Sequence, residues 1–175
     1  MKRPTYRLVL SIALAAIALT TNAWSQELQA QVPGSNAGRG ARFGIALGGI
    51  GRWSGTVELY DGANSAELGV GLWSGAVSVS VVGKRYFFGS RVRPVAGAGL
   101  WLVASGAGEN GSRSAWALVL RAPVGVDAGF ADHHALGLIG NLNRALWVRR
   151  GNPEDTAPSV GRLVPLPELY YRYAR

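Results

Sequence analysis

The sequence has 175 residues, a formal net charge of +8 and no cysteine, which excludes disulfide bonds and thiolate metal sites. This length predicts a single domain. Charged residues make up 16% of the chain, whereas soluble domains average about 25%. Few charges, together with 25 glycines, about twice the usual share, favour a barrel or a tightly curved sheet over a domain with a polar surface.

Residues 1–25 have the pattern of a secretory signal peptide. Basic residues come first, an apolar run covers residues 8–21, and Ala23 and Ser25 occupy the −3 and −1 positions of a cleavage site before Gln26. The run is shorter than a membrane helix, which needs about 20 residues. A cleaved signal is therefore predicted, with an uncleaved anchor as the alternative. Export also argues against a nucleic-acid partner, which the positive charge could otherwise suggest.

Residues 26–40 are polar and without period, and we expect a flexible lead-in there. From residue 41 onward, apolar and small or polar residues alternate with a period of two, which predicts strands. Eight such segments are predicted, at residues 42–50, 53–60, 66–73, 76–88, 91–104, 114–129, 135–143 and 160–173. An even number of strands joined by hairpins favours an all-β, antiparallel, up-and-down barrel over residues 41–175.

Some positions interrupt this alternation. Gly83 is predicted to mark a β-bulge, because the pattern slips before Lys84. Pro165 and Pro167 are expected to weaken the last strand, since neither can donate a ladder hydrogen bond. The longest connections are residues 106–113 and 149–159, and the second widens to 144–159 if the seventh strand ends at residue 143. Both fall at the same end of the predicted barrel.

The hairpin at residues 86–103 carries a resemblance to a known family. Tyr-Phe-Phe-Gly at residues 86–89 is followed by Arg-Pro-Val-Ala-Gly-Ala-Gly-Leu at residues 93–100. This order resembles the central hairpin of small outer-membrane β-barrel proteins of Gram-negative bacteria, such as the opacity proteins. The resemblance implies a monomeric transmembrane barrel that contacts outer-membrane lipid and has a structural or surface-interaction role through its external loops.

Alternation alone leaves open which face is inside. In a membrane barrel the apolar face meets lipid, whereas a soluble periplasmic barrel would enclose an apolar ligand. The other face carries small residues and nearly balanced charges, which suit a narrow lumen in which charges pair and plug the barrel; a selective pore is the alternative. These predicted lumen charges are Arg42, Glu58, Glu67, Arg121, Asp127, Arg162, Glu168 and Arg172.

Two further groups of side chains have predicted roles. Exposed loop residues are candidates for contact with an external partner, whose identity the sequence does not indicate: Glu109, Asn110, Arg113, Arg149, Arg150, Glu154 and Asp155. Aromatic residues near strand ends are candidates for interfacial girdles, with ordinary core packing as the alternative: Trp53, Tyr60, Trp73, Tyr86, Phe87, Phe88, Trp147, Tyr171 and Tyr173.

No catalytic, cofactor-binding or metal-ligating set is predicted. His133 and His134 are adjacent, and neighbouring strand residues point to opposite faces, so a polar turn is favoured over a metal site. No serine lies within eight residues of them, which argues against the His and Ser pair of a lipid-modifying hydrolase. The glycines at residues 48–51 and 97–99 lack the helix and the Lys of a phosphate loop and are interpreted as strand glycines. A lipid-modifying enzyme stays an alternative, because a distant serine could approach in space.

Overall fold

The computed structural model describes residues 38–87, 91–106, 114–151 and 163–174. The predicted signal peptide and most of the predicted lead-in lie outside these residues. Within the described ranges, no helix is long and apolar enough to cross a membrane.

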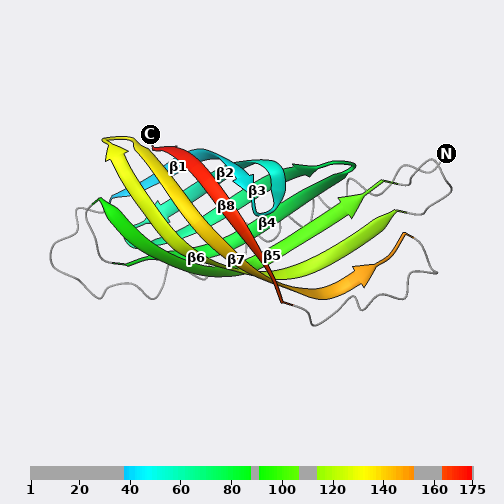
Figure 1. Ribbon diagram of the computed structural model, residues 1–175. Coiled ribbons are helices and arrows are strands. Elements are labelled where there is room, and N and C mark those ends of the chain that lie inside the picture. Colours follow the sequence, from blue (N-terminus) through cyan, green and yellow to red (C-terminus); the bar gives the residue numbers. More distant parts are fainter. Residues whose placement is uncertain (1–37, 88–90, 107–113, 152–162, 175) are drawn as a thin grey trace. The chain divides into compact units, whose positions relative to one another are not determined.

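The described residues form eight strands that close into one barrel in chain order, with every neighbouring pair antiparallel (Figure 1). This confirms the predicted all-β, up-and-down fold. The strands are β1 (Arg39–Gly48), β2 (Gly51–Asp61), β3 (Asn64–Trp73), β4 (Ala76–Tyr86), β5 (Val92–Ser105), β6 (Ala115–Ala131), β7 (His134–Arg149) and β8 (Leu163–Ala174). β8 returns to pair with β1, which leaves no open sheet edge where these two strands meet.

The first strand differs from its prediction at both ends. β1 begins at Arg39, inside the expected lead-in, and stops at Gly48, where a strand to residue 50 was expected. Gly48 and Gly49 have φ angles of +82° and +65°, a region that favours glycine. Gly49 therefore belongs to a tight turn, where its interpretation as a strand glycine was wrong, whereas Gly48 ends β1 and Gly51 begins β2.

The seventh strand is longer than predicted, because it continues through Arg149 instead of ending at residue 143. The β6–β7 register shifts between Leu118 and Val119, which pair with Trp147 and Ala145. This bulge adds one residue to β7 and reverses its alternation, so the sequence pattern breaks although the strand does not. Residues 144–149 are therefore strand and not loop.

The bulge expected at Gly83 is absent from β4. Gly83 pairs with Ala66 on one side and Ala98 on the other, in a continuous register over all of β4. The alternation only appears to slip because Val82, Lys84 and Tyr86 all face inward, so an apolar, a charged and an aromatic residue share one face.

The two prolines lie where β8 has a single neighbour. β8 pairs with β1 only from Glu168 onward, whereas Pro165 and Pro167 pair with β7 at Leu142 and Gly140. Proline is tolerated at such edge positions because fewer ladder hydrogen bonds are lost there. The barrel thus keeps a complete β8 despite both residues.

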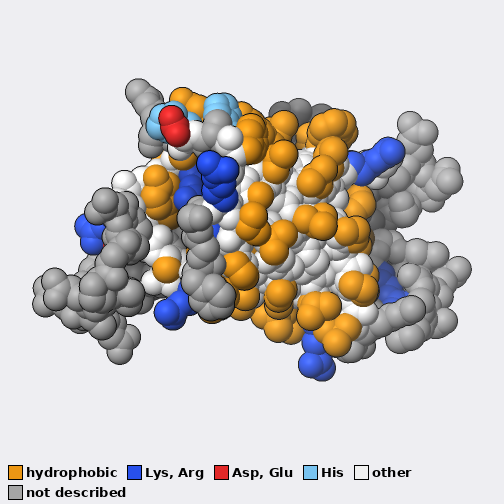
Figure 2. Space-filling view, turned by 60° about the vertical axis from the view of Figure 1, so that its left-hand side comes forward, with side chains coloured by type: hydrophobic (Ala, Val, Ile, Leu, Met, Phe, Trp, Pro, Cys, Tyr) orange, Lys and Arg blue, Asp and Glu red, His pale blue; other side chains and the backbone are white. Residues whose placement is uncertain are grey.

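The apolar face of the barrel points outward, and the polar face points inward. Ile45, Trp53 and Leu138 are 60%, 63% and 58% exposed, whereas Glu58 and Arg172 are 0% and 1% exposed. Figure 2 shows hydrophobic side chains spread over the outer wall, with charged side chains near its ends. The structure therefore decides the question that alternation left open.

The barrel has two different ends. At the turn end lie the short β2–β3, β4–β5 and β6–β7 connections, the start of β1 and the end of β8. At the loop end lie the turns after β1 and β3 and the long connections after β5 and β7. The names turn end and loop end are used below.

Candidate functional site in the barrel lumen

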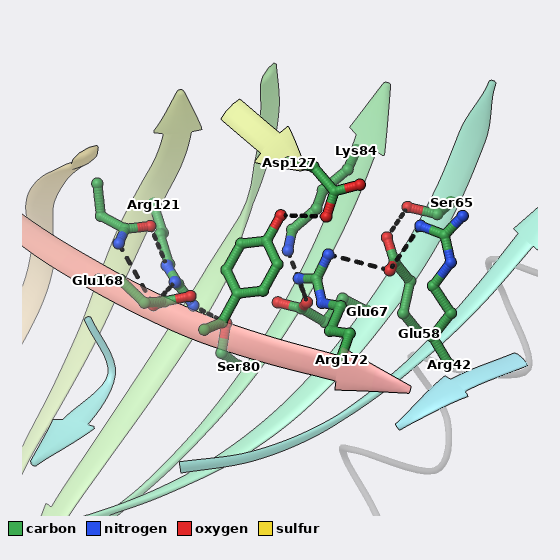
Figure 3. Close-up of polar contacts among 12 residues, drawn as sticks. Arg42, Glu58, Ser65, Glu67, Ser80, Lys84, Arg121, Asp127, Glu168 and Arg172 are labelled. Carbon is green, nitrogen blue, oxygen red and sulfur yellow. Dashed lines mark hydrogen bonds and ion pairs between the residues drawn. The ribbon is translucent and has the colours of Figure 1, made fainter. Parts of the chain in front are cut away.

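The lumen holds two groups of buried charged side chains, separated along the barrel. Figure 3 shows Arg121 with Glu168 at one side and Arg172 with Glu58 and Glu67 at the other. All five side chains are at most 3% exposed. Charges removed from water to this degree are stable only when they pair and form hydrogen bonds. Each group does so.

The larger group is centred on Arg172 of β8. Its Nη1 atom lies 3.1 Å from Glu58 Oε2 and donates to Tyr86 Oη at 2.7 Å, while Nη2 donates to the Glu67 carboxylate. The guanidinium also stacks over the Tyr170 ring, 3.8 Å from its centroid. One arginine thus joins β8 to β2, β3 and β4 through the interior.

The two carboxylates of this group have further donors. Lys84 Nζ donates to Glu67 Oε2 at 2.6 Å. Glu58 Oε1 accepts from Ser65 Oγ at 2.5 Å and from Tyr86 Oη at 2.6 Å. Charge-assisted hydrogen bonds of this kind are roughly twice as strong as neutral ones. They offset the cost of burying both carboxylates.

A third acid extends the group toward the turn end. Asp127 accepts a hydrogen bond from Tyr170 Oη at 2.8 Å and forms an ion pair with Arg93. Arg93 also lies over the Tyr86 ring, 4.9 Å from its centroid. Through the two tyrosines, Asp127 and Arg93 are connected to Arg172.

Arg42 is held less completely. Its Nη1 lies 3.7 Å from Glu58 Oε2, beyond hydrogen-bond distance, and this buried atom has no hydrogen-bond partner among the described residues. Its guanidinium stacks over Tyr60 at 4.4 Å and Tyr86 at 5.4 Å from the ring centroids. Arg42 is therefore positioned by aromatic rings and keeps a donor available.

The smaller group is centred on Arg121 of β6. Its Nη2 lies 2.5 Å from Glu168 Oε2, its Nε donates to Asn141 Oδ1 at 2.8 Å, and its Nη1 donates to Ser80 Oγ at 3.2 Å. All three guanidinium nitrogens thus have partners, on β4, β7 and β8. This group spans the lumen closer to the loop end.

Apolar side chains close the lumen at the loop end. The turn after β1 folds Ile50 inward, where it packs with Trp101 and Val119. The Ile50 carbonyl accepts hydrogen bonds from Trp73 Nε1 at 2.6 Å and Ser78 Oγ at 2.5 Å. These contacts fix the turn inside the barrel and close the described lumen toward the loop end.

The structure places seven of the eight predicted lumen charges inside the barrel, in two groups, and Arg162 lies outside the described residues. Sequence reasoning missed Lys84 and Arg93. Lys84 was missed because of the bulge expected at Gly83. Arg93 was missed because the fifth segment is apolar on both faces. Arg93 is two residues from Val95 and therefore shares its inward face, which was the signal that could have identified it.

Part of the predicted aromatic girdle is wrong. Tyr86 is buried in the lumen, Tyr60 stacks on Arg42, and Trp73 donates to the Ile50 carbonyl, because inward positions near strand ends also accept aromatic residues. Four of the predicted girdle residues are exposed, namely Trp53, Phe87, Trp147 and Tyr173. Phe88 lies outside the described residues.

Most loop candidates cannot be placed. Glu109, Asn110, Arg113, Glu154 and Asp155 lie outside the described residues. Arg149 is the last residue of β7 and is exposed, and Arg150 follows it, partly buried. Arg149 is thus a strand residue at the loop end and not part of a loop.

The two histidines lie at the turn end, around the β6–β7 turn. His134 Nδ1 is 2.6 Å from Tyr171 Oη, which gives that tyrosine a hydrogen-bonding role. Rings of His133 and Tyr173 lie 6.1 Å apart between centroids. In the described part of the chain, no three His, Cys, Asp or Glu residues group as metal ligands.

No protein-family model and no curated protein matches this chain. Among solved structures, it is similar to the N-terminal β-barrel domain of Pseudomonas aeruginosa OprF, with a TM-score of 0.58 and 11% sequence identity. The match covers 80% of this chain and 100% of the OprF chain. At this identity the similarity shows the barrel fold, and the resemblance of residues 86–103 to opacity-like proteins stays a prediction.

Proposed function

We propose that this chain is a non-enzymatic, transmembrane barrel of the Gram-negative outer membrane, exported by a cleaved signal peptide. Its role is structural or surface-binding, exerted through the two long connections at the loop end. One observation carries the location: the outer wall is apolar, whereas the interior holds ion pairs. A closed barrel with this polarity satisfies its backbone hydrogen bonds inside lipid.

The filled lumen favours a structural role over transport. Paired charges at two levels and the inward Ile50 turn occupy the barrel interior. Eight strands leave room for little more than side chains. Contact with other molecules then falls to the outer wall and to the ends of the barrel.

The two alternative functions have weaker support. A soluble barrel that binds an apolar ligand needs an apolar interior, but the inward positions carry Glu58, Lys84 and Arg121. A lipid-modifying enzyme needs a histidine that activates a nucleophile. His134 contacts the Tyr171 hydroxyl instead, beside the aromatic rings of the turn end.

Fractionation with a gel-mobility assay tests the location. The full chain is expressed with its N-terminal segment in a Gram-negative host, and membranes are separated from periplasm. We expect the protein in the outer-membrane fraction, with faster gel migration when unboiled than when boiled, because a closed barrel resists detergent. Recovery in the soluble periplasm without a mobility shift would refute the proposal.

Shortening the long connections tests the role. A variant lacking residues 153–160 should keep its membrane location and its heat-dependent mobility, since β7 ends at Arg149 and β8 begins at Leu163. Loss of a surface-binding phenotype in that variant, with the barrel intact, supports loop-mediated contact. A phenotype that persists after both connections are shortened would contradict it.

A further inference from the structure

A cavity of about 650 Å³ lies at the turn end of the barrel. Its wall includes Arg42, Arg91, Arg93 and Arg172, and its rim includes the turn with Asp132 and His133. Figure 2 shows histidine, acidic and basic side chains gathered at one end of the molecule. Ligand cavities span about 300–1,000 Å³, so this volume suits a small molecule.

The charged residues of the cavity wall are mostly cationic. Four guanidinium groups line it, whereas Asp132 is its one acidic lining residue. Three further acids, Glu58, Glu67 and Asp127, lie behind the wall. These carboxylates are already bound by Arg172, Lys84, Arg93, Ser65 and the two lumen tyrosines.

Arg42 and Arg91 keep donors that the lumen does not use, and Arg172 Nε is also buried without a hydrogen-bond partner among the described residues. Arg42 Nη1 is buried without a hydrogen-bond partner among the described residues. Arg91 is exposed just before β5, and within the described ranges no ion pair to a carboxylate involves it. A buried donor without an acceptor is unfavourable, so an acceptor entering the cavity would be favoured at Arg42.

We propose that this cavity binds a soluble polyvalent anion bearing phosphate or carboxylate groups, with Arg42 and Arg91 as its principal ligands. Guanidinium groups form paired hydrogen bonds with both kinds of anion. Arg93 supports the site from the wall, while Arg172 contributes positive charge and its Nη1 and Nη2 atoms donate to Tyr86 and Glu67. We expect a soluble ligand, because Arg42, Arg93 and Arg172 lie on the inward face, away from the apolar outer wall.

This inference is independent of the membrane location, because the cavity belongs to the barrel itself. The test is isothermal titration of the full chain, folded in a non-ionic detergent, with pyrophosphate and with citrate at constant ionic strength. We expect binding of one anion per chain. The double variant Arg42→Gln, Arg91→Gln should bind at least tenfold more weakly.

Arg52→Gln is the matched control. Arg52 is an exposed arginine of β2 at the loop end, so the substitution removes the same charge without touching the cavity. Its affinity should stay within twofold of the unchanged protein. If the double variant fails to show the mobility of a folded barrel, Arg91→Gln alone is used, and at least threefold weaker binding is expected.

The two probes distinguish the chemistry of the ligand. Tighter binding of pyrophosphate supports a phosphate compound, and tighter binding of citrate supports a polycarboxylate. The proposal would be overturned if neither pyrophosphate nor citrate binds. Equal affinity in the unchanged protein and in the arginine variants would also overturn it, because binding would then come from net charge alone.

Discussion

Arg172 donates a hydrogen bond to the carboxylate of Glu67, although 105 residues separate them in the chain. Arg172 is on β8 and Glu67 is on β3, so the contact joins strands that are not neighbours in the sheet. Both side chains are buried at the same level of the lumen. This pair holds opposite parts of the wall together from inside.

Removing Arg172 should strongly destabilise the barrel. In Arg172→Met, Glu58 loses its ion pair with this arginine, and Glu67 keeps only Lys84 at hydrogen-bond distance. Because an uncompensated buried charge is costly, we expect the free energy of unfolding to fall by about 3–5 kcal/mol. Urea unfolding of the detergent-folded protein measures this change. Arg52→Met, an exposed control, should change it by less than about 0.5 kcal/mol.

A matched pair of glycines in β7 tests the packing of the lumen. A Cβ on Gly137 would overlap the Tyr170 ring, whereas a Cβ on Gly140 would lie 3.7 Å from its nearest neighbour, the Val124 carbonyl oxygen. Gly137→Ala should therefore lower the free energy of unfolding by about 1–3 kcal/mol through overpacking. Gly140→Ala should leave it unchanged or slightly raised. Equal effects at both positions would mean that Tyr170 can move aside.

An arginine substituted on the outer wall should show whether that wall faces lipid or water. Leu138 is 58% exposed within β7, and Leu138→Arg should cost about 2–4 kcal/mol in a lipid bilayer if the wall faces hydrocarbon. Val92→Arg, at the start of β5 and the turn end, should cost about 0–1 kcal/mol, because the interface is close. Unfolding in lipid vesicles measures both. A cost below about 0.5 kcal/mol at Leu138 would instead indicate water at this face.

The filled lumen should not conduct small solutes. Arg121, Glu168 and the inward Ile50 turn occupy the interior toward the loop end. Vesicles that contain the folded protein should therefore swell in a pentose solution no faster than protein-free vesicles. Swelling that scales with the amount of folded protein would contradict a plugged lumen and support the selective pore.

Local pattern was sufficient to predict the fold. Most strands are indicated by a period of two, which depends only on the pleat of the backbone, and polar connections join the strands as hairpins. The strand order and the closed barrel follow from the even count and the hairpins. The errors arose where the period is disturbed. The bulge at Leu118 interrupts the alternation of β7 before the strand ends, and the inward Lys84 led to the prediction of a bulge at Gly83.

The lumen site was predictable only in part. Inward parity identified Glu58, Glu67 and Arg172 as members of one face, because alternate residues of a strand share a side. The partner of each charge was not predictable, since pairing across the interior depends on strand tilt and stagger, which no local pattern records. Arg93 illustrates this, because its alternation with Val95 places it on the inward face but does not indicate its ion pair with Asp127.

The sequence alone thus determined where the strands lie, their order along the chain and which residues share a face. All of these depend on local properties of the backbone. Closure of the sheet decided the rest. It turned the apolar face outward, brought Arg172 to Glu67 and left Arg42 and Arg91 around one cavity. Alternation divides each strand into two faces but does not say which face becomes the interior. That depends on the direction in which the sheet curves, and curvature is a property of the whole barrel.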